Sequence, residues 1–279
     1  MVARARRALR VGAIGHTGTL DPMATGVLVL VIGRATRLAQ FFSGHRKQYE
    51  AVVRLGVVTD TWDRTGAPQP GPGGSLPSLA DVERTLETFL GARPQMPPPY
   101  SAKKVDGVPA YKVARRGGVT ALVPAMVELH AARVTGSDLP LVRLTLLTSA
   151  GYYVRSLVNE LGQALGCGAC LEALRRTASG EFDLRQAVSL SDVEQDPGGA
   201  AARLATLEAL LPGFPSVVLD EAGVRKAQHG NDITAAVPAA AGSQDWRGPV
   251  RLLTPDGQLL AIATPTERPG VLHPAVVLK

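Results

Sequence analysis

The sequence has little of what stabilises secreted, membrane-spanning or base-stacking proteins. It contains two cysteines, Cys167 and Cys170, which argues against a disulfide-stapled secreted domain. The longest apolar run, Val27–Ile32, is strand-sized and far short of the roughly 18 residues that cross a bilayer. The basic first residues lead into no apolar signal core. We therefore expect a cytoplasmic protein with no membrane partner.

Common cofactor and metal motifs are also missing. There is no P-loop and no GxGxxG after a strand. The CGAC at 167–170 is a CxxC, but zinc would need two further ligands, so a buried structural pair is favoured over a metal or redox site. The sequence also lacks the H-x-E and P-C-x-x-C of zinc nucleobase deaminases, and no serine elbow supports a triad with His16 and Asp21. We expect no metal and no cofactor.

Positive charge is clustered. The net charge is +6, and residues 1–50 hold eight Lys/Arg against two Asp/Glu, while residues 100–118 hold five against one. Clustered cations favour a polyanionic partner, because they release counterions from phosphates. Charge alone leaves a solvated basic face as an equal alternative. Aromatic residues make up only 4%, which disfavours a broad platform for stacking single-stranded bases.

The pattern of apolar and turn residues predicts an α+β domain over 1–186, a linker with a short helix over 187–214, and a small β-barrel-like module over 215–279. In the first part a mixed, largely antiparallel sheet is expected with flanking helices. We expect helices at residues 3–10, 34–42, after a Ser78 cap, at 156–165 and at 168–177. We expect strands at residues 25–33, 49–56, 126–135 and 141–149.

One polar segment, GHTGTLDPMATG at 15–26, has the composition of a functional loop. Three glycines, three threonines and an Asp-Pro pair in twelve residues exclude a regular element. The segment must be a tight loop that leads into an apolar strand, so Asp21 would stand at a strand edge and face a cleft. Spacing alone leaves two interpretations open, a catalytic carboxylate or an Asp that caps a turn before Pro22.

Four blocks in a fixed order carry a family resemblance. GHTGTLDPMATGVLVLVIGRATRL (15–38) resembles the catalytic motif of TruB-type bacterial tRNA pseudouridine-55 synthases. KQYEAVVRLGVVTDTWDRTG (47–66) resembles their tyrosine-bearing strand and Thr-Asp-Thr turn, and QMPPPYSAKKVDGVPAYKVARRG (95–117) resembles their proline-rich, basic RNA-contact segment. GYYVRSLVNELGQALGCGACLEALRRTASG (151–180) resembles their arginine motif and the following helices. Together they cover most of residues 12–186.

The resemblance implies a role for each matching catalytic position. Asp21 would be the nucleophile, Arg155 would pair with it, and Tyr49 would stack on the flipped uracil and take part in proton transfer. Without the resemblance, the tyrosine would be an ordinary core residue in an apolar strand, and the arginine a surface ion pair.

The resemblance also implies substrate contacts. Tyr153 and Leu174 would wall the pocket, His16 would fill the gap left in the T-loop, and Asp63 would contact RNA. Phosphates would be bound by a basic cluster made of Lys103, Lys104, Lys112, Arg115 and Arg116. Taken alone, the tyrosine and the leucine would be core residues and the histidine a loop residue.

The family implies a cofactor-free isomerase that acts on the T-stem-loop of tRNA as a monomer, without an obligatory protein partner. It also implies a PUA-type RNA-binding domain over 215–279. Relatives begin with a strand resembling K-P-x-G-x-T-S-x-D, which this sequence does not contain before its first helix. Two alternatives stay open. One is a non-catalytic tRNA-binding or tRNA-folding protein, and the other is an RNA-guided synthase, for which no partner-binding extension is visible.

The basic cluster generates the first prediction. The double substitution Lys103→Glu with Lys104→Glu should weaken tRNA binding and flatten its salt dependence, because fewer counterions are then released from phosphates. Filter binding over a series of salt concentrations measures the slope. An unchanged slope would remove this cluster from the interface.

Overall fold

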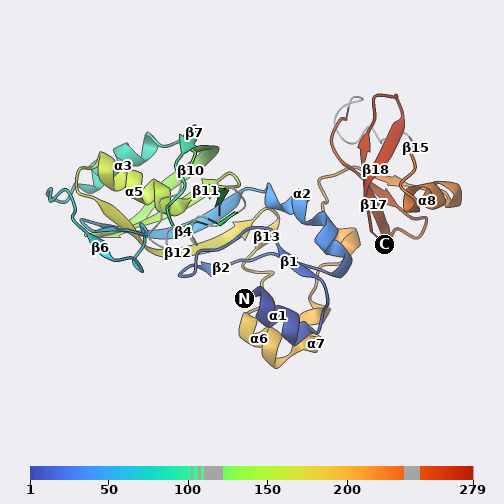
Figure 1. Cartoon of the computed structure of the whole chain (residues 1–279), viewed down its shortest axis with the longest axis horizontal. Helices are drawn as coiled ribbons and strands as arrows, with labels where there is room; N and C mark the ends of the chain where they lie inside the picture. The colour runs from blue at the N-terminus through green and yellow to red at the C-terminus, as the bar shows by residue number, and fades with distance from the viewer. Residues whose placement is uncertain (102, 106–107, 110–121, 236–245, 279) are drawn as a thin grey trace. The chain divides into compact units, whose positions relative to one another are not determined.

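The chain folds into two compact units of mixed α and β structure. The structure is a computed structural model that describes residues 1–101, 103–105, 108–109, 122–235 and 246–278. Contacts group 18–29 with 42–187, and group 1–17 and 30–41 with 188–279. Strands and helices are interspersed along the described chain (Figure 1), which confirms the α+β class. No helix among these residues is long and apolar enough to span a membrane.

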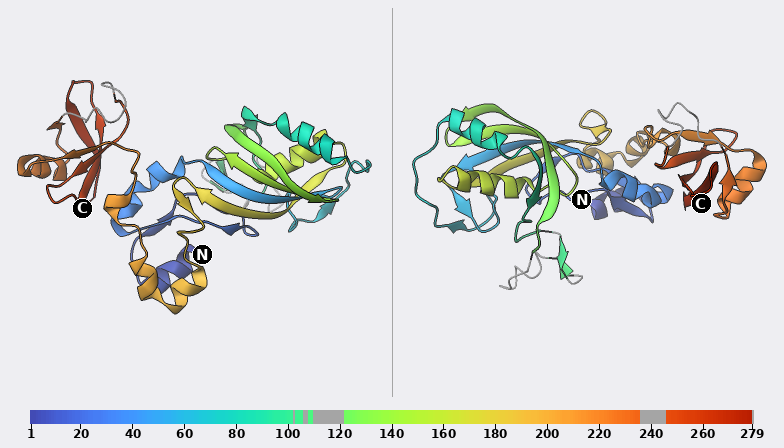
Figure 2. Two further views of the ribbon diagram at one scale, coloured as in Figure 1. Left: turned by 180° about the vertical axis from the view of Figure 1, so that it is seen from behind. Right: turned by 90° about the horizontal axis from the view of Figure 1, so that it is seen from above.

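The larger unit is built on a seven-stranded, largely antiparallel sheet, with α3 (Leu79–Glu87) and α5 (Val154–Ala164) packed against it (Figure 2). Its path runs through β13 (Phe182–Asp183), β12 (Ala169–Ser179), β4 (Lys47–Leu55), β11 (Leu141–Thr148), β10 (Ala125–Asp138) and β7 (Gly91–Gln95). Beside this path, β2 (Thr25–Gly26) pairs in parallel with β12. Two small hairpins complete the unit, β5 (Val58–Thr59) with β6 (Pro68–Gln69) and β8 (Lys104–Val105) with β9 (Val108–Pro109).

Local sequence signals explain most of these elements. In β4, buried residues alternate with more exposed ones, as a strand with one buried face requires. Ser78 caps α3 through a capping box with Asp81, and Val82 and Leu86 are buried on the inner face of the helix. The predicted strands at 126–135 and 141–149 and the predicted helix at 156–165 are confirmed by β10, β11 and α5.

The predicted helix over 168–177 is wrong, because these residues form the central strand β12. Leu-Glu-Ala-Leu-Arg-Arg has high helix propensity, but pairing with β4 over the whole strand outweighs that preference. Two register shifts, between Leu171 and Ala173 and between Arg176 and Ala178, interrupt simple alternation. The sequence therefore lacks the period-two pattern that identifies a half-buried strand.

The predicted single strand over 25–33 is also wrong. It is divided into β2 and β3 (Leu30–Ile32), which belong to different sheets. Gly26 has a φ of +98°, and a Cβ at this position would lie 2.1 Å from the Arg176 carbonyl oxygen. The predicted helix over 34–42 is a 3₁₀ helix, η1 (Gly33–Leu38), followed by the short α2 (Ala39–Ser43).

The smaller unit contains two groups of elements. Near the amino terminus, β1 (Ile14–His16) pairs with β3, and α1 (Val2–Leu9) contacts α6 (Leu190–Gln195) and α7 (Pro197–Ala202), with an Arg4–Glu194 ion pair. The 3₁₀ turn η2 (Leu207–Ala209) follows α7.

The second group is a five-stranded sheet with α8 (Glu221–Gln228) and its own apolar core. Its order is β14 (Ser216–Val218), β16 (Val250–Leu253), β17 (Leu259–Pro265), β18 (Val271–Val277) and β15 (Ile233–Thr234). The predicted hairpin turn at Pro255–Gly257 is confirmed, since the Gly257 N–H donates to the Thr254 carbonyl at 2.9 Å. A PUA-type identity for this sheet, and the division at 1–186, 187–214 and 215–279, stay predictions.

Gln95 connects β7 to the start of α5. Its Nε2 donates to the Tyr153 carbonyl at 3.1 Å, and its Oε1 accepts from the Tyr153 N–H at 2.8 Å. The side chain is buried, so Gln95→Ala should lower the free energy of unfolding by about 1–3 kcal/mol, because the Tyr153 N–H loses its partner and the Tyr153 carbonyl keeps only the Leu157 N–H. Urea denaturation measures the change. Gln69→Ala on the exposed β6 is the control and should be nearly neutral; equal effects would contradict this prediction.

Candidate active site

The larger unit places a carboxylate at the end of a tight loop. Asp21 lies in the loop that leads to β2, and its carbonyl accepts from the Ala24 N–H at 2.9 Å, which closes a turn around Pro22. The Asp21 side chain is 22% exposed. The carboxylate is therefore partly accessible while the backbone that carries it is held in a turn.

Arg155 binds this carboxylate with two parallel hydrogen bonds. Its Nε donates to Asp21 Oδ2 at 2.9 Å and its Nη2 donates to Oδ1 at 2.7 Å. This fork geometry fixes both the distance and the plane of the carboxylate. Arg155 is the second residue of α5, where the helix dipole disfavours a cation. The negative charge of Asp21 offsets that penalty, so the ion pair stabilises the helix end as well as the loop.

The rest of the Arg155 guanidinium is satisfied by backbone. Nη1 donates to the Thr61 carbonyl at 3.1 Å and Nη2 to the Tyr100 carbonyl at 3.0 Å. Arg155 is 4% exposed. Because the guanidinium is planar and bound on several sides, it has little freedom to move away from Asp21. Sequence reasoning did not identify these two carbonyl acceptors, since a backbone oxygen has no residue-specific signature.

A second carboxylate, that of Asp63, lies near Arg155. Asp63 Oδ2 is 3.7 Å from Arg155 Nη1, and Asp63 is buried. Its Oδ1 accepts hydrogen bonds from the hydroxyl groups of Thr61 and Thr65 at 2.9 and 2.6 Å and from the Thr65 N–H at 2.9 Å. The observed partners of Asp63 are protein groups, and its contact with RNA stays a prediction.

Two tyrosines flank the ion pair. Burial raises the pKa of Tyr49 above its ordinary value, and Asp21 acts in the same direction, while the neighbouring Arg176 guanidinium lowers it. Burial likewise raises the pKa of Tyr153, which Ser101 and Arg155 partly offset. Both phenols therefore carry their proton at neutral pH.

Leu174 lies on β12, opposite Ala51 of β4, and not on a helix. It is buried in the same apolar cluster as Tyr49. Its place in the wall of a substrate pocket stays a prediction.

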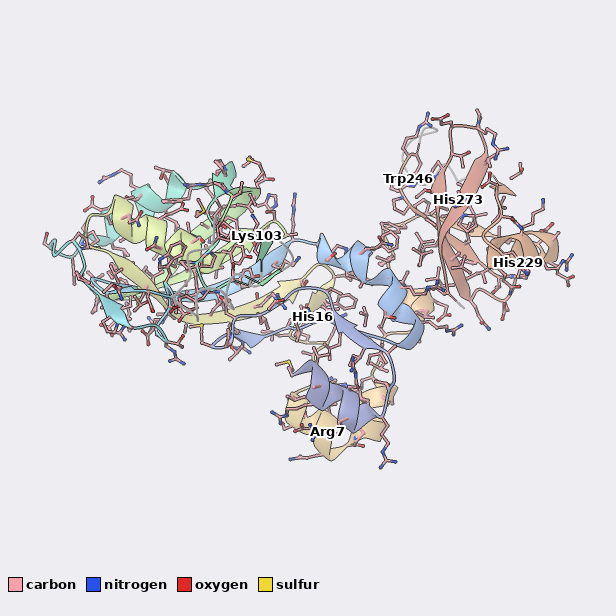
Figure 3. The ribbon with its side chains drawn as sticks, in the orientation of Figure 1. Arg7, His16, Lys103, His229, Trp246 and His273 are labelled. Carbon is pink, nitrogen blue, oxygen red and sulfur yellow. The ribbon has the colours of Figure 1, made fainter. Side chains whose placement is uncertain are left out.

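His16 and the basic cluster are the remaining predicted residues. His16 is exposed on β1 of the smaller unit (Figure 3). Lys103 donates from Nζ to the Val123 carbonyl at 2.7 Å. Lys104 lies on β8, and its side chain is outside the described part of the structure. Lys112, Arg115 and Arg116 fall outside the described residues altogether.

Two buried cations near the Asp21 loop were missed by sequence reasoning. Arg176 and Lys47 are 2% and 5% exposed, and the Gly18 backbone of the loop approaches both side chains. Lys47 Nζ donates to the carbonyls of Ser43 and His45 at 2.8 and 2.6 Å. Burial, assisted by the charge of Arg176, lowers the Lys47 pKa to about 8. The spacing Lys47–Tyr49 was a usable signal, because strand residues two apart share a face.

The described residues contain no group of three or more His, Cys, Asp or Glu side chains arranged to bind a metal ion. Cys167 and Cys170 are free and buried, and burial raises the pKa of the Cys170 thiol to about 11. A thiol in this state is a poor nucleophile and a poor metal ligand at neutral pH.

The site combines an oriented carboxylate, a protonated phenol and an apolar wall. A carboxylate in such surroundings can attack an electrophilic carbon or stabilise positive charge that develops on it. Arg155 supplies the opposite charge where Asp21 would otherwise be desolvated alone. The arrangement suits covalent or proton-transfer chemistry on a flat, partly apolar substrate.

The lowered pKa of Lys47 predicts how stability depends on pH. Between about pH 8 and the ordinary lysine value of 10.5, the unfolded chain binds this proton and the folded chain does not. The free energy of unfolding should therefore rise with pH in this window by more in the wild type than in Lys47→Met. Urea denaturation from pH 7.5 to 10.5 measures both curves, with the exposed Lys226→Met as the control. Parallel curves for wild type and Lys47→Met would contradict the prediction.

Two known family models match the chain. Residues 6–154 match the model of the TruB family pseudouridylate synthase (N terminal domain), and residues 155–211 match that of the tRNA pseudouridylate synthase B C-terminal domain. The chain is 41% identical over 280 residues to tRNA pseudouridine synthase B of Solibacter usitatus, covering 100% of this chain and 94% of that protein. It is 40% identical over 274 residues to the Burkholderia pseudomallei (strain 668) protein of the same name, covering 97% and 89%.

Solved structures share the fold. The chain superimposes with a TM-score of 0.69 at 23% identity on a chain of the "Crystal Structure of a Cbf5-Nop10-Gar1 Complex", covering 96% of this chain and 74% of that one. The TM-score is 0.70 at 21% identity for the "Structure of H/ACA RNP bound to a substrate RNA containing 2'-deoxyuridine", covering 100% and 80%. From the family models and from two relatives of about 40% identity over nearly its whole length, the chain belongs to the TruB family of pseudouridylate synthases.

Proposed function

We propose that this protein converts a uridine in the T-loop of tRNA to pseudouridine, with Asp21 as the nucleophile. The bidentate ion pair between Asp21 and Arg155 is the observation that carries the proposal. Nearly full-length relatives named tRNA pseudouridine synthase B support both the reaction and the class of substrate.

The chemistry explains why the site needs these groups. In the isomerisation the bond from the sugar to N1 breaks and a bond from the sugar to C5 forms, while C5 loses a proton and N1 gains one. Atoms and charge balance, so no co-reactant is required. The base must detach, turn and reattach in one pocket, and water must not compete with it. Asp21 is oriented by Arg155 and attacks or stabilises the electron-poor centre while the base turns.

Aromatic and apolar side chains would hold the base during this step. The Tyr49 ring offers a flat face for the uracil, and Tyr153 and Leu174 close the pocket around it. The target must first leave its stack, at a cost of a few kcal/mol that is smaller in a loop than in a duplex. Contacts along the RNA backbone would offset this cost. In the proposal they come from His16 and from the basic cluster at Lys103 and Lys104.

The role proposed for Asp63 differs from the RNA contact that the resemblance implies. Its carboxylate is buried, its Oδ1 accepts hydrogen bonds within the Thr61–Thr65 turn, and its Oδ2 faces Arg155. These contacts favour a role in orienting Arg155 over a direct contact with RNA. The five-stranded sheet with α8 would be an additional RNA-binding module of PUA type. The protein would act as a monomer without a protein partner.

A non-catalytic tRNA-binding or tRNA-folding protein is the second candidate. The basic segments would serve it equally well. It does not explain why a carboxylate is oriented by two hydrogen bonds in a partly accessible pocket, because binding polyanionic RNA gains nothing from a fixed negative charge.

Tritium release from C5-labelled uridine in a T-stem-loop transcript tests the proposal. The wild type should release tritium. Asp21→Asn should lose at least ~1,000-fold in rate while keeping its affinity for RNA within a few-fold, because the group that reacts is removed and the pocket shape is kept. Asp138→Asn, on the exposed part of β10, is the matched control and should behave as wild type. Substantial turnover by Asp21→Asn would end the nucleophile assignment, and tight binding without release by wild type would favour the second candidate.

A further inference from the structure

Arg176 is the largest of the fully buried side chains in the described structure. It lies on β12, two residues beyond Leu174, and its exposure is 2%. Among the described residues no carboxylate lies within ion-pair distance of its guanidinium. A buried charge without a counterion is destabilising, so its presence needs a specific reason.

The guanidinium of Arg176 binds both ends of the Asp21 loop. Nη2 donates to the Gly18 carbonyl at 3.1 Å and Nη1 to the Thr19 carbonyl at 3.4 Å, before Asp21 in the chain. Nε donates to the Val27 carbonyl at 2.7 Å, after Asp21. One planar group therefore spans the loop that carries the nucleophile.

Backbone contacts reinforce this attachment. The Val27 N–H donates to the Arg176 carbonyl at 2.8 Å, and β2 pairs with β12 at Gly26 and Arg176. The approach is so close that only a glycine fits at position 26. The Asp21 loop is thus fixed to β12 by Arg176 on one side, while Arg155 fixes the carboxylate itself on the other.

The same guanidinium faces Tyr49. The two residues are cross-strand partners in the pairing of β12 with β4. Burial, the largest effect, raises the pKa of Tyr49, and the charge of Asp21 acts in the same direction, whereas the Arg176 guanidinium lowers it. Lys47, two residues before Tyr49 on β4, adds a second cation next to Arg176. Arg176 is therefore the charge that favours an ionised Tyr49.

We propose that Arg176 is a positioning residue of the isomerisation, fixing the Asp21 loop to β12 and stabilising negative charge on the Tyr49 oxygen. This inference rests on the proposed function. In the step that it assists, the Tyr49 phenol gives its proton to N1, and the phenolate that Arg176 stabilises then takes the C5 proton as the C5–H bond breaks and its electrons stay in the base. A proton ends on N1, so the reaction stays balanced.

Two substitutions separate the contributions of Arg176. Arg176→Met keeps an unbranched apolar stem but removes the charge and all three loop hydrogen bonds. Arg176→Lys keeps the charge but cannot bind three carbonyls in a plane. Arg143→Met, on the exposed face of β11, is the matched control. Thermal unfolding identifies which variants are folded. If Arg176→Met does not fold, the rate and the titration are measured on Arg176→Lys instead.

Single-turnover rates at saturating tRNA should fall by about 100-fold in Arg176→Met, the scale expected when a catalytic group is displaced by about 1 Å. The Kd for tRNA should stay within a few-fold, since Arg176 is inaccessible to RNA. Arg176→Lys should be intermediate and Arg143→Met should match wild type. A folded Arg176→Met with a wild-type rate, or a loss confined to Kd, would overturn the positioning role.

A second readout does not depend on turnover. The Tyr49 phenol can be titrated by NMR with ¹³Cζ-labelled tyrosine, assigned with Tyr49→Phe. Its titration should move to higher pH in Arg176→Met and stay near wild type in Arg176→Lys. An unchanged titration in Arg176→Met would overturn the electrostatic role. If wild type failed to turn over at all, the proposed function would fail, whereas the titration would still decide whether Arg176 acts on Tyr49.

Discussion

The ion pair between Asp21 and Arg155 is the interaction on which the site depends. A carboxylate at a loop end would normally turn towards water, and an arginine at a helix N-terminus would be repelled by the helix dipole. Each side chain removes the penalty of the other. The pair also joins elements that are distant in sequence, because Arg155 donates to Thr61 and Tyr100 as well as to Asp21. The loop, the turn after β5 and the segment after β7 therefore converge on one guanidinium.

Two further buried charged residues, Asp63 and Arg176, support this pair. Asp63 Oδ2 faces Arg155 and, in the proposal, orients it. Asp63 Oδ1 accepts hydrogen bonds from the threonine hydroxyl groups of the same turn. Arg176 supports the loop from β12 by binding carbonyls, which satisfies the hydrogen-bonding capacity of the guanidinium but leaves its charge unbalanced. The site is thus rigid before any substrate arrives. Such preorganisation is the condition under which fixed charges contribute most to lowering a reaction barrier.

Local signals were sufficient for several elements. The Ser78 cap, the alternation in β4 and the Pro-Asp-Gly turn at 255–257 each depend on residues within a few positions of one another. Local signals gave wrong predictions where pairing between distant strands decided the secondary structure. Residues 169–179 have helix-forming side chains but pair with β4, and residues 25–33 divide at Gly26, whose backbone conformation follows from the close approach of Arg176. No window along the chain contains that information.

The sequence by itself determined the chemical identity of the site. Asp21, Tyr49 and Arg155 stand in motifs whose order and composition indicate one family, and the described structure gathers these three residues at one place. Only the tertiary structure decided how they are supported. It showed the carbonyls that fix Arg155, the buried position of Asp63, and the cations Arg176 and Lys47 next to the Asp21 loop. The physical reason is that backbone acceptors and burial are properties of packing, which residues far apart in the chain create together.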